Sequence, residues 1–290
     1  MQLVNLGQDQ ALPDFHFEER GGAKIWVDRH FADHRFIDQI ADCDLLLAQP
    51  DCRIIKDQRK IRIGRLTLKI AGRAYNLYIK RFNAFSIRYQ IGSLMSVSAA
   101  LKSLEGAALL QTAGIRTARP VAAVERRVNG ILTKSFFITE EINGAKTADA
   151  YWLEDLSTRQ LKDQRQRRRL FLQCIAQLFQ SLHAGHIYHN DLKDANILVV
   201  ADVMKNSISL FLLDLEGVRR YSNLSARRRT KNLVQLNRTL GRYLQQSDKL
   251  FFLRQYLGPS FSNIKARREL IESVVRDSKL LDAKKLRQGR

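Results

Sequence analysis

The most informative segment of the 290-residue chain reads His189-Asn190-Asp191-Leu192-Lys193-Asp194-Ala195-Asn196-Ile197-Leu198. Carboxylate, ammonium and amide groups lie close together in its centre, and an apolar run at 197–200 follows at once. Such a run predicts a short buried strand, which would fix the polar groups at one strand end. In one interpretation the His, Asp and Asn side chains merely cap a turn. The pattern across all ten residues favours a chemical role instead.

This segment resembles the catalytic loop of the eukaryotic-like protein kinase superfamily, in which His-x-Asp is followed by an Asn five residues after the Asp. The resemblance implies that Asp191 orients the acceptor hydroxyl. Lys193 would offer its ammonium group to the phosphoryl group during transfer, when negative charge must be stabilised. The amide oxygen of Asn196 would bind Mg²⁺. Asp191 and Lys193 are therefore the expected catalytic residues.

A second segment, Leu212-Leu213-Asp214-Leu215-Glu216, follows at the distance that a hairpin requires. Kinases carry a second metal-binding Asp here, usually within Asp-Phe-Gly, so the resemblance assigns Asp214 to the metal. By itself, an Asp at a strand end is often only a turn residue. Leu215 and Glu216 replace the usual Phe and Gly, and a switch based on that Phe is not expected. Glu216 is either a further carboxylate near the metal or a surface charge.

A third segment, Leu77-Tyr78-Ile79-Lys80, resembles the Val-Ala-Ile-Lys strand, whose lysine holds the nucleotide phosphates. Alternation places Tyr78 and Lys80 on one strand face, which should be the nucleotide side. Glu105 is the only acidic residue between Lys80 and Glu125, so a Lys80–Glu105 ion pair is expected. In the competing interpretation Lys80 and Arg81 are solvated charges and Glu105 is an exposed helix residue.

The expected glycine-rich loop over the phosphates is missing, because the corresponding hairpin tip reads Asp57-Gln58-Arg59-Lys60. Backbone amides could still cradle phosphate there, with Arg59 or Lys60 adding charge. The backbone groups of Glu140-Glu141-Ile142, where the two halves join, are expected to pair with adenine. The cofactor-binding set is therefore Lys80, Glu105, Glu140, Ile142, Arg59 and Lys60.

Hydrophobic patterning predicts a β-rich half followed by a helical half. The first half contains three antiparallel strands within 52–82, a helix at 97–112, and strands at 121–124 and 135–139, forming a five-stranded sheet. The second half contains a long helix within 155–182, strands at 197–200 and 208–213, and helices from 225 onward, one of them with Leu233, Leu236, Leu240 and Leu244 on a single face.

Before these halves, a hairpin turns at Gly21-Gly22 and a short helix covers 36–47. The predicted fold is α+β and bilobal, like a protein kinase, with ATP and Mg²⁺ bound between the lobes. The expected divisions are an extension at 1–50 that leans on the small lobe, an N-lobe at 51–142 with one αC-type helix, and a C-lobe at 143–290.

The chain after Asp214 lacks Ala-Pro-Glu and has no proline before Pro259, so a long activation segment is absent from the sequence. Because that segment builds the peptide platform of protein kinases, its absence argues against a conventional protein kinase. With the Lys80 strand and the degenerate glycine loop, the region from about Ile54 to Leu244 resembles the lipopolysaccharide kinase family. That resemblance implies phosphorylation of a sugar hydroxyl (Kdo or heptose) of the lipopolysaccharide inner core, with ATP and Mg²⁺ as cofactors.

Two alternatives remain open. An atypical Ser/Thr protein kinase with a short activation segment would share the same motifs. A pseudokinase, which keeps the fold as a binding module only, is disfavoured because Lys80, Asp191, Asn196 and Asp214 are all present. Transfer of label from ATP to core lipid or to protein separates these activities.

The formal net charge is +20, from 49 Lys+Arg and 29 Asp+Glu. Basic clusters fall mainly in the helical half, at Arg165, Arg167-Arg168-Arg169, Arg219-Arg220, 227–229, Lys265 and Arg267-Arg268. Each basic residue near an anionic leaflet contributes roughly 1 kcal/mol to membrane binding. Nucleic acid is not an expected partner, because aromatic residues are not interleaved with these clusters as stacking platforms. On a single helix, such a run is commonly only the solvated face.

Cellular location is inferred from cysteine usage and hydropathy. Cys43, Cys52 and Cys174 form no CxxC pair, which is typical of a reducing cytosol. No signal peptide is visible at 1–13, and the longest stretch without charged residues, 170–190, contains three His. We expect a cytoplasmic protein, peripheral at the inner membrane, whose partners are a lipopolysaccharide core or lipid-linked sugar acceptor and the anionic membrane surface. No obligate protein partner is evident.

Overall fold

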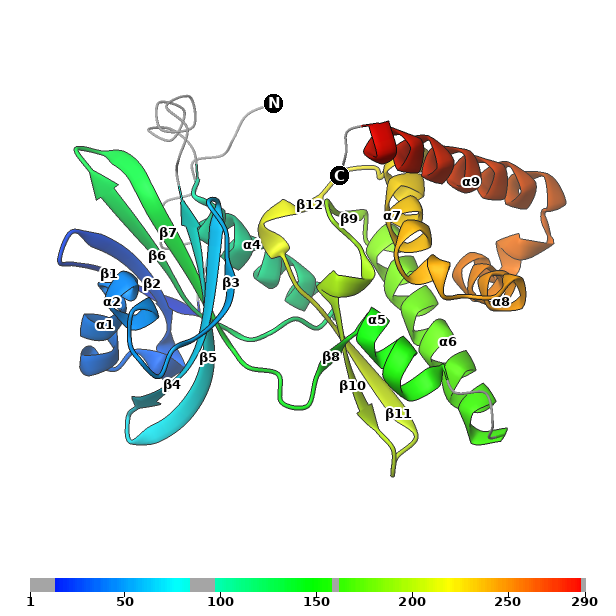
Figure 1. The fold of residues 1–290 in the computed structure, drawn as a ribbon. Coiled ribbons are helices and arrows are strands. Elements are labelled where there is room, and N and C mark those ends of the chain that lie inside the picture. Colours follow the sequence, from blue (N-terminus) through cyan, green and yellow to red (C-terminus); the bar gives the residue numbers. More distant parts are fainter. Residues whose placement is uncertain (1–13, 84–96, 158–161, 288–290) are drawn as a thin grey trace. The chain divides into compact units, whose positions relative to one another are not determined.

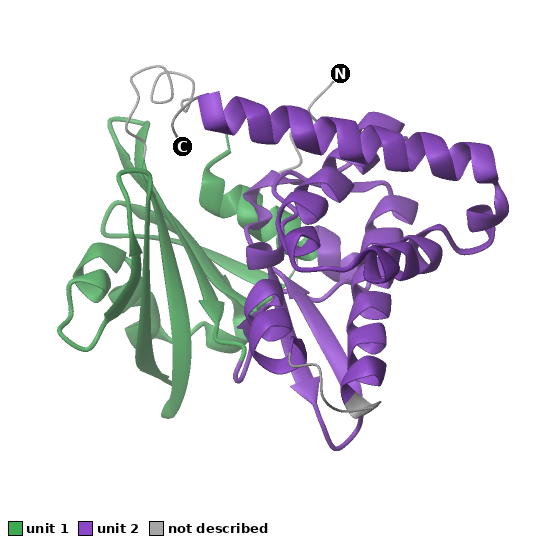
Figure 2. Ribbon diagram, turned by 45° about the vertical axis from the view of Figure 1, so that its right-hand side comes forward, with its two compact units in different colours: residues 1–108, 118–142 green, residues 109–117, 143–290 purple. Residues whose placement is uncertain are grey.

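The computed structural model describes residues 14–83, 97–157 and 162–287 (Figure 1). The chain forms two compact units (Figure 2). Unit 1 contains residues 1–108 and 118–142, and unit 2 contains residues 109–117 and 143–290. The boundary therefore falls within helix α4 (Ala99–Thr112), whose last turn belongs to unit 2.

Unit 1 is built on an antiparallel sheet with the strand order β1-β2-β6-β7-β5-β4-β3. The strands are β1 (Phe15–Arg20), β2 (Ala23–Asp28), β3 (Arg53–Asp57), β4 (Ile61–Ile70), β5 (Arg73–Asn83), β6 (Pro120–Val128) and β7 (Ile131–Glu140). The alternation in β4 buries Leu66, Leu68 and Ile70, as expected of a strand with one dry face. The three antiparallel strands predicted at 52–82 are confirmed by the pairing of β3, β4 and β5.

Within the described residues the sheet has seven strands, so the predicted five-stranded sheet is too small. The difference arises because β2, from the N-terminal hairpin, pairs with β6. The single helix predicted at 36–47 is also wrong, since α1 (His34–Ile40) and α2 (Cys43–Leu47) are separate. Asp42 caps α2 by accepting a hydrogen bond from the Asp44 backbone N–H, which starts a new helix. Both helices contribute side chains to the same core as β4 and β6.

Helix α4 packs against one face of this sheet. Ser98 precedes it and accepts a hydrogen bond from the Leu101 backbone N–H, so the helix begins two residues later than the predicted Val97. Ala100 and Leu104 pack with Trp26, Phe82, Ala123 and Phe137. Glu105 lies on the exposed side of the same helix.

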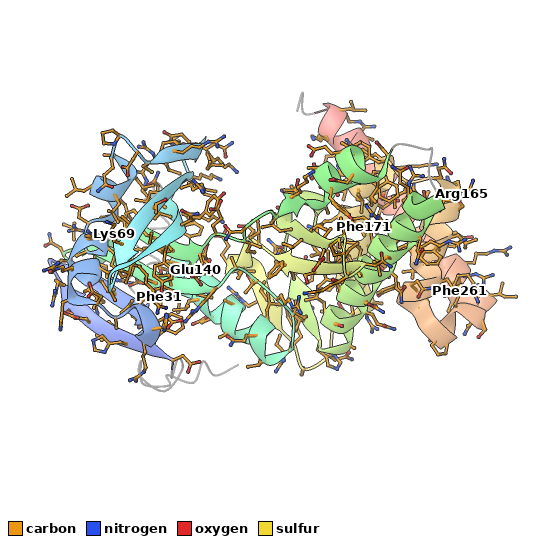
Figure 3. All side chains as sticks on the ribbon, turned by 90° about the horizontal axis from the view of Figure 1, so that it is seen from below. Phe31, Lys69, Glu140, Arg165, Phe171 and Phe261 are labelled. Carbon is orange, nitrogen blue, oxygen red and sulfur yellow. The ribbon has the colours of Figure 1, made fainter. Side chains whose placement is uncertain are left out.

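Unit 2 combines helices with two small sheets. After β8 (Lys146–Thr147) come α5 (Ala148–Tyr151), a π-helical turn (Trp152–Leu156) and α6 (Lys162–Ala184). The ring of Phe171 in α6 packs against Tyr151 and Trp152, whereas Arg165 on the same helix is exposed (Figure 3). The long helix predicted within 155–182 corresponds to α6.

The strands β10 (Ile197–Asp202) and β11 (Ser207–Leu212) form the predicted antiparallel pair, and β9 (Ile187–His189) pairs with β12 (Val218–Arg220). The remaining helices are α7 (Ala226–Arg238), α8 (Gln246–Leu257) and α9 (Ile264–Arg287). The helix expected to carry Leu240 and Leu244 ends at Arg238, because Thr239 leaves helical geometry at φ −112° and ψ −92°. None of the helices in the described ranges is long and apolar enough to cross a membrane.

Candidate active site

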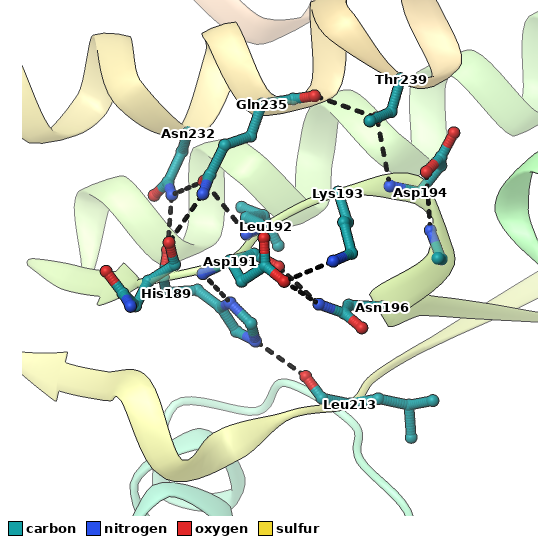
Figure 4. Close-up of polar contacts among 12 residues, drawn as sticks. His189, Asp191, Leu192, Lys193, Asp194, Asn196, Leu213, Asn232, Gln235 and Thr239 are labelled. Atoms are coloured by element: carbon teal, nitrogen blue, oxygen red, sulfur yellow. Dashed lines mark hydrogen bonds and ion pairs between the residues drawn. The ribbon is translucent and has the colours of Figure 1, made fainter. Parts of the chain in front are cut away.

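The segment between β9 and β10 is organised around buried His189 (Figure 4). The Asp191 backbone N–H donates to His189 Nδ1 at 3.2 Å, so Nδ1 carries no proton. His189 Nε2 then donates to the Leu213 carbonyl at 2.8 Å. Burial lowers the pKa of His189, which keeps the ring neutral and preserves both bonds. A neutral imidazole thereby ties the loop to the end of β11.

The three loop residues predicted to act together lie within hydrogen-bonding distance. Asp191 Oδ2 accepts from Lys193 Nζ at 2.6 Å and from Asn196 Nδ2 at 3.1 Å. Asn196 Nδ2 also donates to the Asp191 carbonyl at 2.7 Å. The Asp191 and Lys193 side chains are each 40% exposed, so an acceptor from solvent can reach the carboxylate. The Asn196 bond to the Asp191 carbonyl also closes the turn, so the chemical role of Asp191 stays a prediction.

Asp214 is placed beside Asn196 by its neighbour Leu213. The Leu213 backbone N–H donates to the Asn196 carbonyl at 2.9 Å, and its own carbonyl accepts from His189. Asp214 itself adopts left-handed geometry at φ +62° and ψ +55°, which is uncommon outside glycine, Asn and Asp. The sharp turn separates β11 from the following 3₁₀ turn (Leu215–Gly217).

The donor set of these residues fits Mg²⁺. Asn196 uses its amide nitrogen in both of its hydrogen bonds to Asp191, so its Oδ1 is the atom suited to a cation. An amide oxygen and the Asp214 carboxylate are hard ligands of the type that Mg²⁺ prefers. No group of three or more His, Cys, Asp or Glu with metal-binding geometry occurs in the described part of the chain. Two protein ligands match a nucleotide-bound Mg²⁺, which takes its other oxygens from phosphates and water.

Helix α7 supplies loop-holding residues that the sequence analysis missed. Asn232 is fully buried, and its Nδ2 donates to the His189 carbonyl at 2.6 Å. Gln235 accepts from the Leu192 backbone N–H at 3.1 Å and donates to the Asn190 carbonyl at 2.7 Å. A signal was present, because the polar residues Asn232 and Gln235 stand three positions apart on α7, next to the buried apolar residues Leu233, Val234 and Leu236.

Replacing Gln235 with Ala is expected to lower kcat and leave the KM for ATP nearly unchanged. The variant leaves the Leu192 N–H and the Asn190 carbonyl without their partner, at a cost of about 1–3 kcal/mol in loop stability. Steady-state kinetics measures the effect. The matched control is Asn237→Ala, which removes a bond from the other side of α7 to Ser278 and should leave kcat unchanged. Equal kcat values for the two variants would contradict the loop-holding role.

The polar contacts of Asn232 continue to α8 through His183. His183 Nε2 faces Asn232 Oδ1 at 3.3 Å, and His183 Nδ1 faces the Tyr256 hydroxyl at 2.8 Å. Because Asn232 Nδ2 is used by the His189 carbonyl, Oδ1 must accept, and His183 carries its proton on Nε2. Burial lowers the pKa of His183 to about 4 and raises the pKa of Tyr256 to about 12.

Acidification is expected to destabilise the protein through His183. Its pKa is about 4 when folded and roughly 6.5 when unfolded, so below pH 6.5 only the unfolded chain gains the proton. The contribution of His183 to the free energy of unfolding is fully present above pH 6.5. It is lost as the pH drops toward 4, and the loss amounts to about 3 kcal/mol. Urea unfolding between pH 7.5 and 4.5 measures the slope. In His183→Gln the slope should be smaller than in the parent, and an identical slope would refute the assignment.

In unit 1, Lys80 lies near the middle of β5, with its Nζ 4.7 Å from the centroid of the Phe82 ring. Its neighbour Arg81 forms an ion pair with Asp44 at 2.9 Å and is 17% exposed. Arg81 is therefore not a solvated charge. The competing interpretation, in which Lys80 and Arg81 are both solvated charges, is wrong for Arg81. The Lys80–Glu105 ion pair stays a prediction, with Lys80 on the strand and Glu105 on α4.

The expected adenine-binding segment is anchored to the sheet of unit 1. Glu141 accepts two hydrogen bonds from Arg65, at 2.8 and 2.7 Å, and its backbone N–H donates to the Asn76 carbonyl. The Arg65 guanidinium lowers the pKa of Glu141 and keeps the carboxylate ionised. The Glu140 backbone N–H donates to the Arg119 carbonyl at 3.0 Å, and the pairing of this segment with adenine stays a prediction.

The remaining cofactor candidates lie at the exposed tip between β3 and β4. The Arg59 carbonyl accepts from Asn83 Nδ2 at 2.9 Å, and the Lys60 carbonyl accepts from the Asn83 backbone N–H at 3.0 Å. The backbone of the tip is thus held by the end of β5, while both basic side chains are exposed. Their role toward phosphate stays a prediction.

A β-sheet unit that carries Lys80, and a helical unit whose loop groups Asp191 with Lys193 and Asn196, define a protein-kinase-like phosphotransferase. The model of the lipopolysaccharide kinase (Kdo/WaaP) family matches residues 56–256, and the chain belongs to this family. Family membership shows that the protein is a kinase, and it implies that ATP is used.

A solved structure, "WaaP in complex with acyl carrier protein", is similar to this chain with a TM-score of 0.63 and 19% sequence identity. The similarity covers 86% of this chain and 97% of that chain. At this identity the likeness concerns the fold, with its β-rich N-terminal part and helical C-terminal part. Among curated proteins, no sequence matches the chain.

Proposed function

We propose that the protein transfers the γ-phosphoryl group of ATP to a hydroxyl of an inner-core sugar of lipopolysaccharide, either Kdo or heptose. The observation that carries this proposal is the Asp191 carboxylate, paired with Lys193 and Asn196 yet accessible to solvent. The family model supplies the substrate class, since it spans the loop, the Lys80 strand and Asp214.

In the proposed reaction, the acceptor hydroxyl donates a hydrogen bond to the Asp191 carboxylate. The hydroxyl oxygen forms a bond to the γ-phosphorus while the bond to the ADP oxygen breaks, and the hydroxyl proton passes to Asp191. Lys193, 2.6 Å from the same carboxylate, stabilises negative charge on the phosphoryl group during transfer. Asn196 and Asp214 would hold Mg²⁺, which neutralises phosphate charge when bound.

The residues proposed to bind the nucleotide belong to unit 1. Lys80 would hold the phosphates with Glu105 fixing its position, and Arg59 or Lys60 would add charge. The Glu140 carbonyl and the Ile142 backbone would pair with adenine. Support comes from the two hydrogen bonds between Arg65 and Glu141, because Glu141 stands between Glu140 and Ile142 and these bonds fix its position.

A sugar acceptor is favoured over a protein acceptor by the path of the chain after Asp214. The chain enters the 3₁₀ turn, forms β12 beside β9, and reaches the start of α7 at Ala226. The chain between Asp214 and Ala226 is too short to contain a long segment that could form a peptide platform. This path disfavours a conventional protein kinase, and transfer of label from ATP to core lipid or to protein separates the sugar kinase from an atypical protein kinase with a short activation segment.

We place the enzyme at the cytoplasmic face of the inner membrane, where lipid-linked acceptors are accessible. Exposed basic and apolar residues occur along the length of α9, including Lys265, Ile264, Leu280 and Leu286. This combination suits an anionic lipid surface. Acyl carrier protein is a further candidate partner, because the WaaP structure contains one. An apolar cavity of about 470 Å³ among α7, α8 and α9 could receive an acyl chain.

Mass spectrometry of core lipid from cells with and without the gene tests the proposed function. We expect one phosphate group to be missing from an inner-core sugar in the deletion strain. The parent gene should restore it, and an Asp191→Asn gene produced at the same level should not. Identical core lipids in all strains would refute the proposal.

A further inference from the structure

Five side chains form a compact cluster on the surface that leads to Asp191. We call Tyr188, Tyr221, Arg219, Arg228 and Lys231 the tyrosine–cation patch. Lys231 is exposed, Arg219, Arg228 and Tyr221 are half-buried, and Tyr188 lies buried beneath them. All five belong to unit 2, and the proposed mechanism uses none of them.

The patch is a product of the chain path that replaces an activation segment. Strand β12 pairs with β9 so that Arg219 lies opposite Tyr188, which puts their side chains on one face. The Tyr221 backbone N–H then donates to the His186 carbonyl at 3.0 Å. Ser225 caps α7 by accepting from the Arg228 backbone N–H, and α7 packs on β9 (Figure 1). Strand, turn and helix therefore converge on the two rings.

The aromatic rings hold the cations in place. The Arg228 guanidinium lies 4.0 Å from the Tyr221 ring centroid, and Lys231 Nζ lies 5.5 Å from the Tyr188 ring centroid. The two rings meet edge to face, with their centroids 6.4 Å apart. Cation–π contacts restrict long, flexible side chains without neutralising their charge. The positive groups are thus pre-positioned and still able to bind an anion.

The charge of the patch is not balanced within the described residues. The segment 218–231 contains no Asp or Glu, although it also includes Arg220, Arg227 and Arg229. No carboxylate in the described part of the chain forms an ion pair with any of these six cations (Arg219, Arg220, Arg227, Arg228, Arg229 and Lys231). Concentrated like charge raises the energy of the folded state and creates a strong local potential. An anionic ligand would remove this repulsion.

A direct contact connects the patch to the catalytic loop. Lys231 Nζ lies 3.5 Å from Asn190 Oδ1, and Asn190 immediately precedes Asp191. The backbone of Gly217 packs closely against the Asn190 side chain, because a Cβ added at Gly217 would lie only 2.6 Å from the Asn190 Cβ. Its carbonyl also accepts from Gln235. Adjacent Cα atoms are about 3.8 Å apart, so a group bound at Lys231 and a hydroxyl at Asp191 fit on one saccharide.

We propose that the tyrosine–cation patch binds an anionic group, carboxylate or phosphate, of the saccharide acceptor and thereby aligns the acceptor hydroxyl with Asp191. This inference rests on the proposed function and adds the residues that select the acceptor. Lys231 and Arg228 contact the anion, and Tyr188 and Tyr221 keep them extended toward it. Neutral saccharides of similar size would be poor acceptors.

Kinetics with a soluble, deacylated core saccharide tests the patch without any membrane. In Lys231→Gln and in Arg228→Gln we expect the KM for the saccharide to rise roughly tenfold or more, as for a lost hydrogen bond to a charged group. The KM for ATP and kcat should stay within about twofold. Lys231→Arg should restore most of the affinity. The control, Lys265→Gln, removes the same charge from exposed α9 and should leave all constants unchanged.

Changing the ligand identifies which anion is bound. One arm uses the saccharide with its carboxylates esterified, and the other uses the dephosphorylated saccharide. With the parent enzyme, one of these two modified saccharides should show the same rise in KM that Lys231→Gln shows with the unmodified saccharide. The same modification of the saccharide should not raise the KM of the Lys231→Gln enzyme any further. If both modified saccharides retain the parent KM with the parent enzyme, the patch does not bind an acceptor anion.

The outcomes separate the inference from the proposed function. If the parent phosphorylates the saccharide while Lys231→Gln and Arg228→Gln keep its KM, the inference fails and the function stands. If the parent phosphorylates no saccharide, the function itself fails. If the patch variants instead weaken binding to anionic vesicles as much as Lys265→Gln does, with no effect on the saccharide KM, the patch is a membrane contact and the inference is wrong.

Discussion

Replacing Asp191 with Asn is expected to lower kcat by about 10²–10⁴-fold, the range for loss of a positioned general base. The amide keeps the shape of the side chain, but it cannot take the proton of the acceptor hydroxyl. The change also removes the negative charge that holds Lys193 at 2.6 Å. ATP binding should be nearly unaffected, because the nucleotide-binding residues proposed here are in unit 1. Transfer of labelled phosphate gives kcat, and calorimetry gives the affinity for ATP.

The matched control for this experiment is Asp202→Asn in β10. Asp202 is 41% exposed and lies 3.6 Å from Lys205, so its surroundings resemble those of Asp191, which is 40% exposed and pairs with Lys193. We expect parent-like kcat for the control. An Asp191→Asn enzyme as active as the control would remove Asp191 from the mechanism.

Replacing Asp214 with Asn should cause a loss of similar size with a different signature. The variant lacks the carboxylate proposed to bind Mg²⁺ beside Asn196, so half-maximal activity should require a higher Mg²⁺ concentration. At saturating Mg²⁺ we expect kcat to stay at least about 10²-fold below the parent, because the remaining ligands hold the metal poorly. Activity measured against Mg²⁺ concentration gives both quantities.

Glu216→Gln, two residues along the chain, provides the comparison for Asp214. A shifted Mg²⁺ requirement in this variant would make Glu216 a second carboxylate near the metal, whereas an unchanged requirement would leave Asp214 as the acidic ligand. Parent-like Mg²⁺ dependence in Asp214→Asn would contradict the metal-binding role of that residue. The two variants therefore resolve the alternatives that the sequence left open for Glu216.

Local patterns predicted much of the fold because they act over short distances. The alternation at 61–70 sets a half-buried strand, and the turn at Ala71-Gly72 sets its pairing with β5. Asp191, Lys193 and Asn196 also lie within one short loop. Their closeness in sequence is therefore enough to bring their side chains together.

The features that were missed depend on contacts between distant parts of the chain. The pairing of β2 with β6 joins residues about one hundred positions apart, and no local pattern specifies it. Asn232 and Gln235 support the catalytic loop from more than forty residues away. Their helix looked simply amphipathic, since a polar residue on its inner face has meaning only when the loop against it is known.

The structure also changes the interpretation of the +20 charge. From sequence, the basic runs indicated mainly membrane attraction, and the absence of interleaved aromatic residues argued against nucleic acid as the partner. In the fold, Arg219 of one run lies opposite Tyr188, which is distant in sequence, and Arg228 of another run lies over the ring of Tyr221, which directly follows Arg220. Part of the charge is therefore gathered next to the catalytic loop, and part remains on exposed α9.

The most direct test of the central claim is transfer of labelled γ-phosphate from ATP by the purified protein, with core saccharide lipid and general protein substrates offered separately. We predict that the label appears on a Kdo or heptose hydroxyl of the saccharide, requires Mg²⁺, and is lost in Asp191→Asn. Label on protein but not on saccharide, or equal labelling by the parent and by Asp191→Asn, would contradict the account.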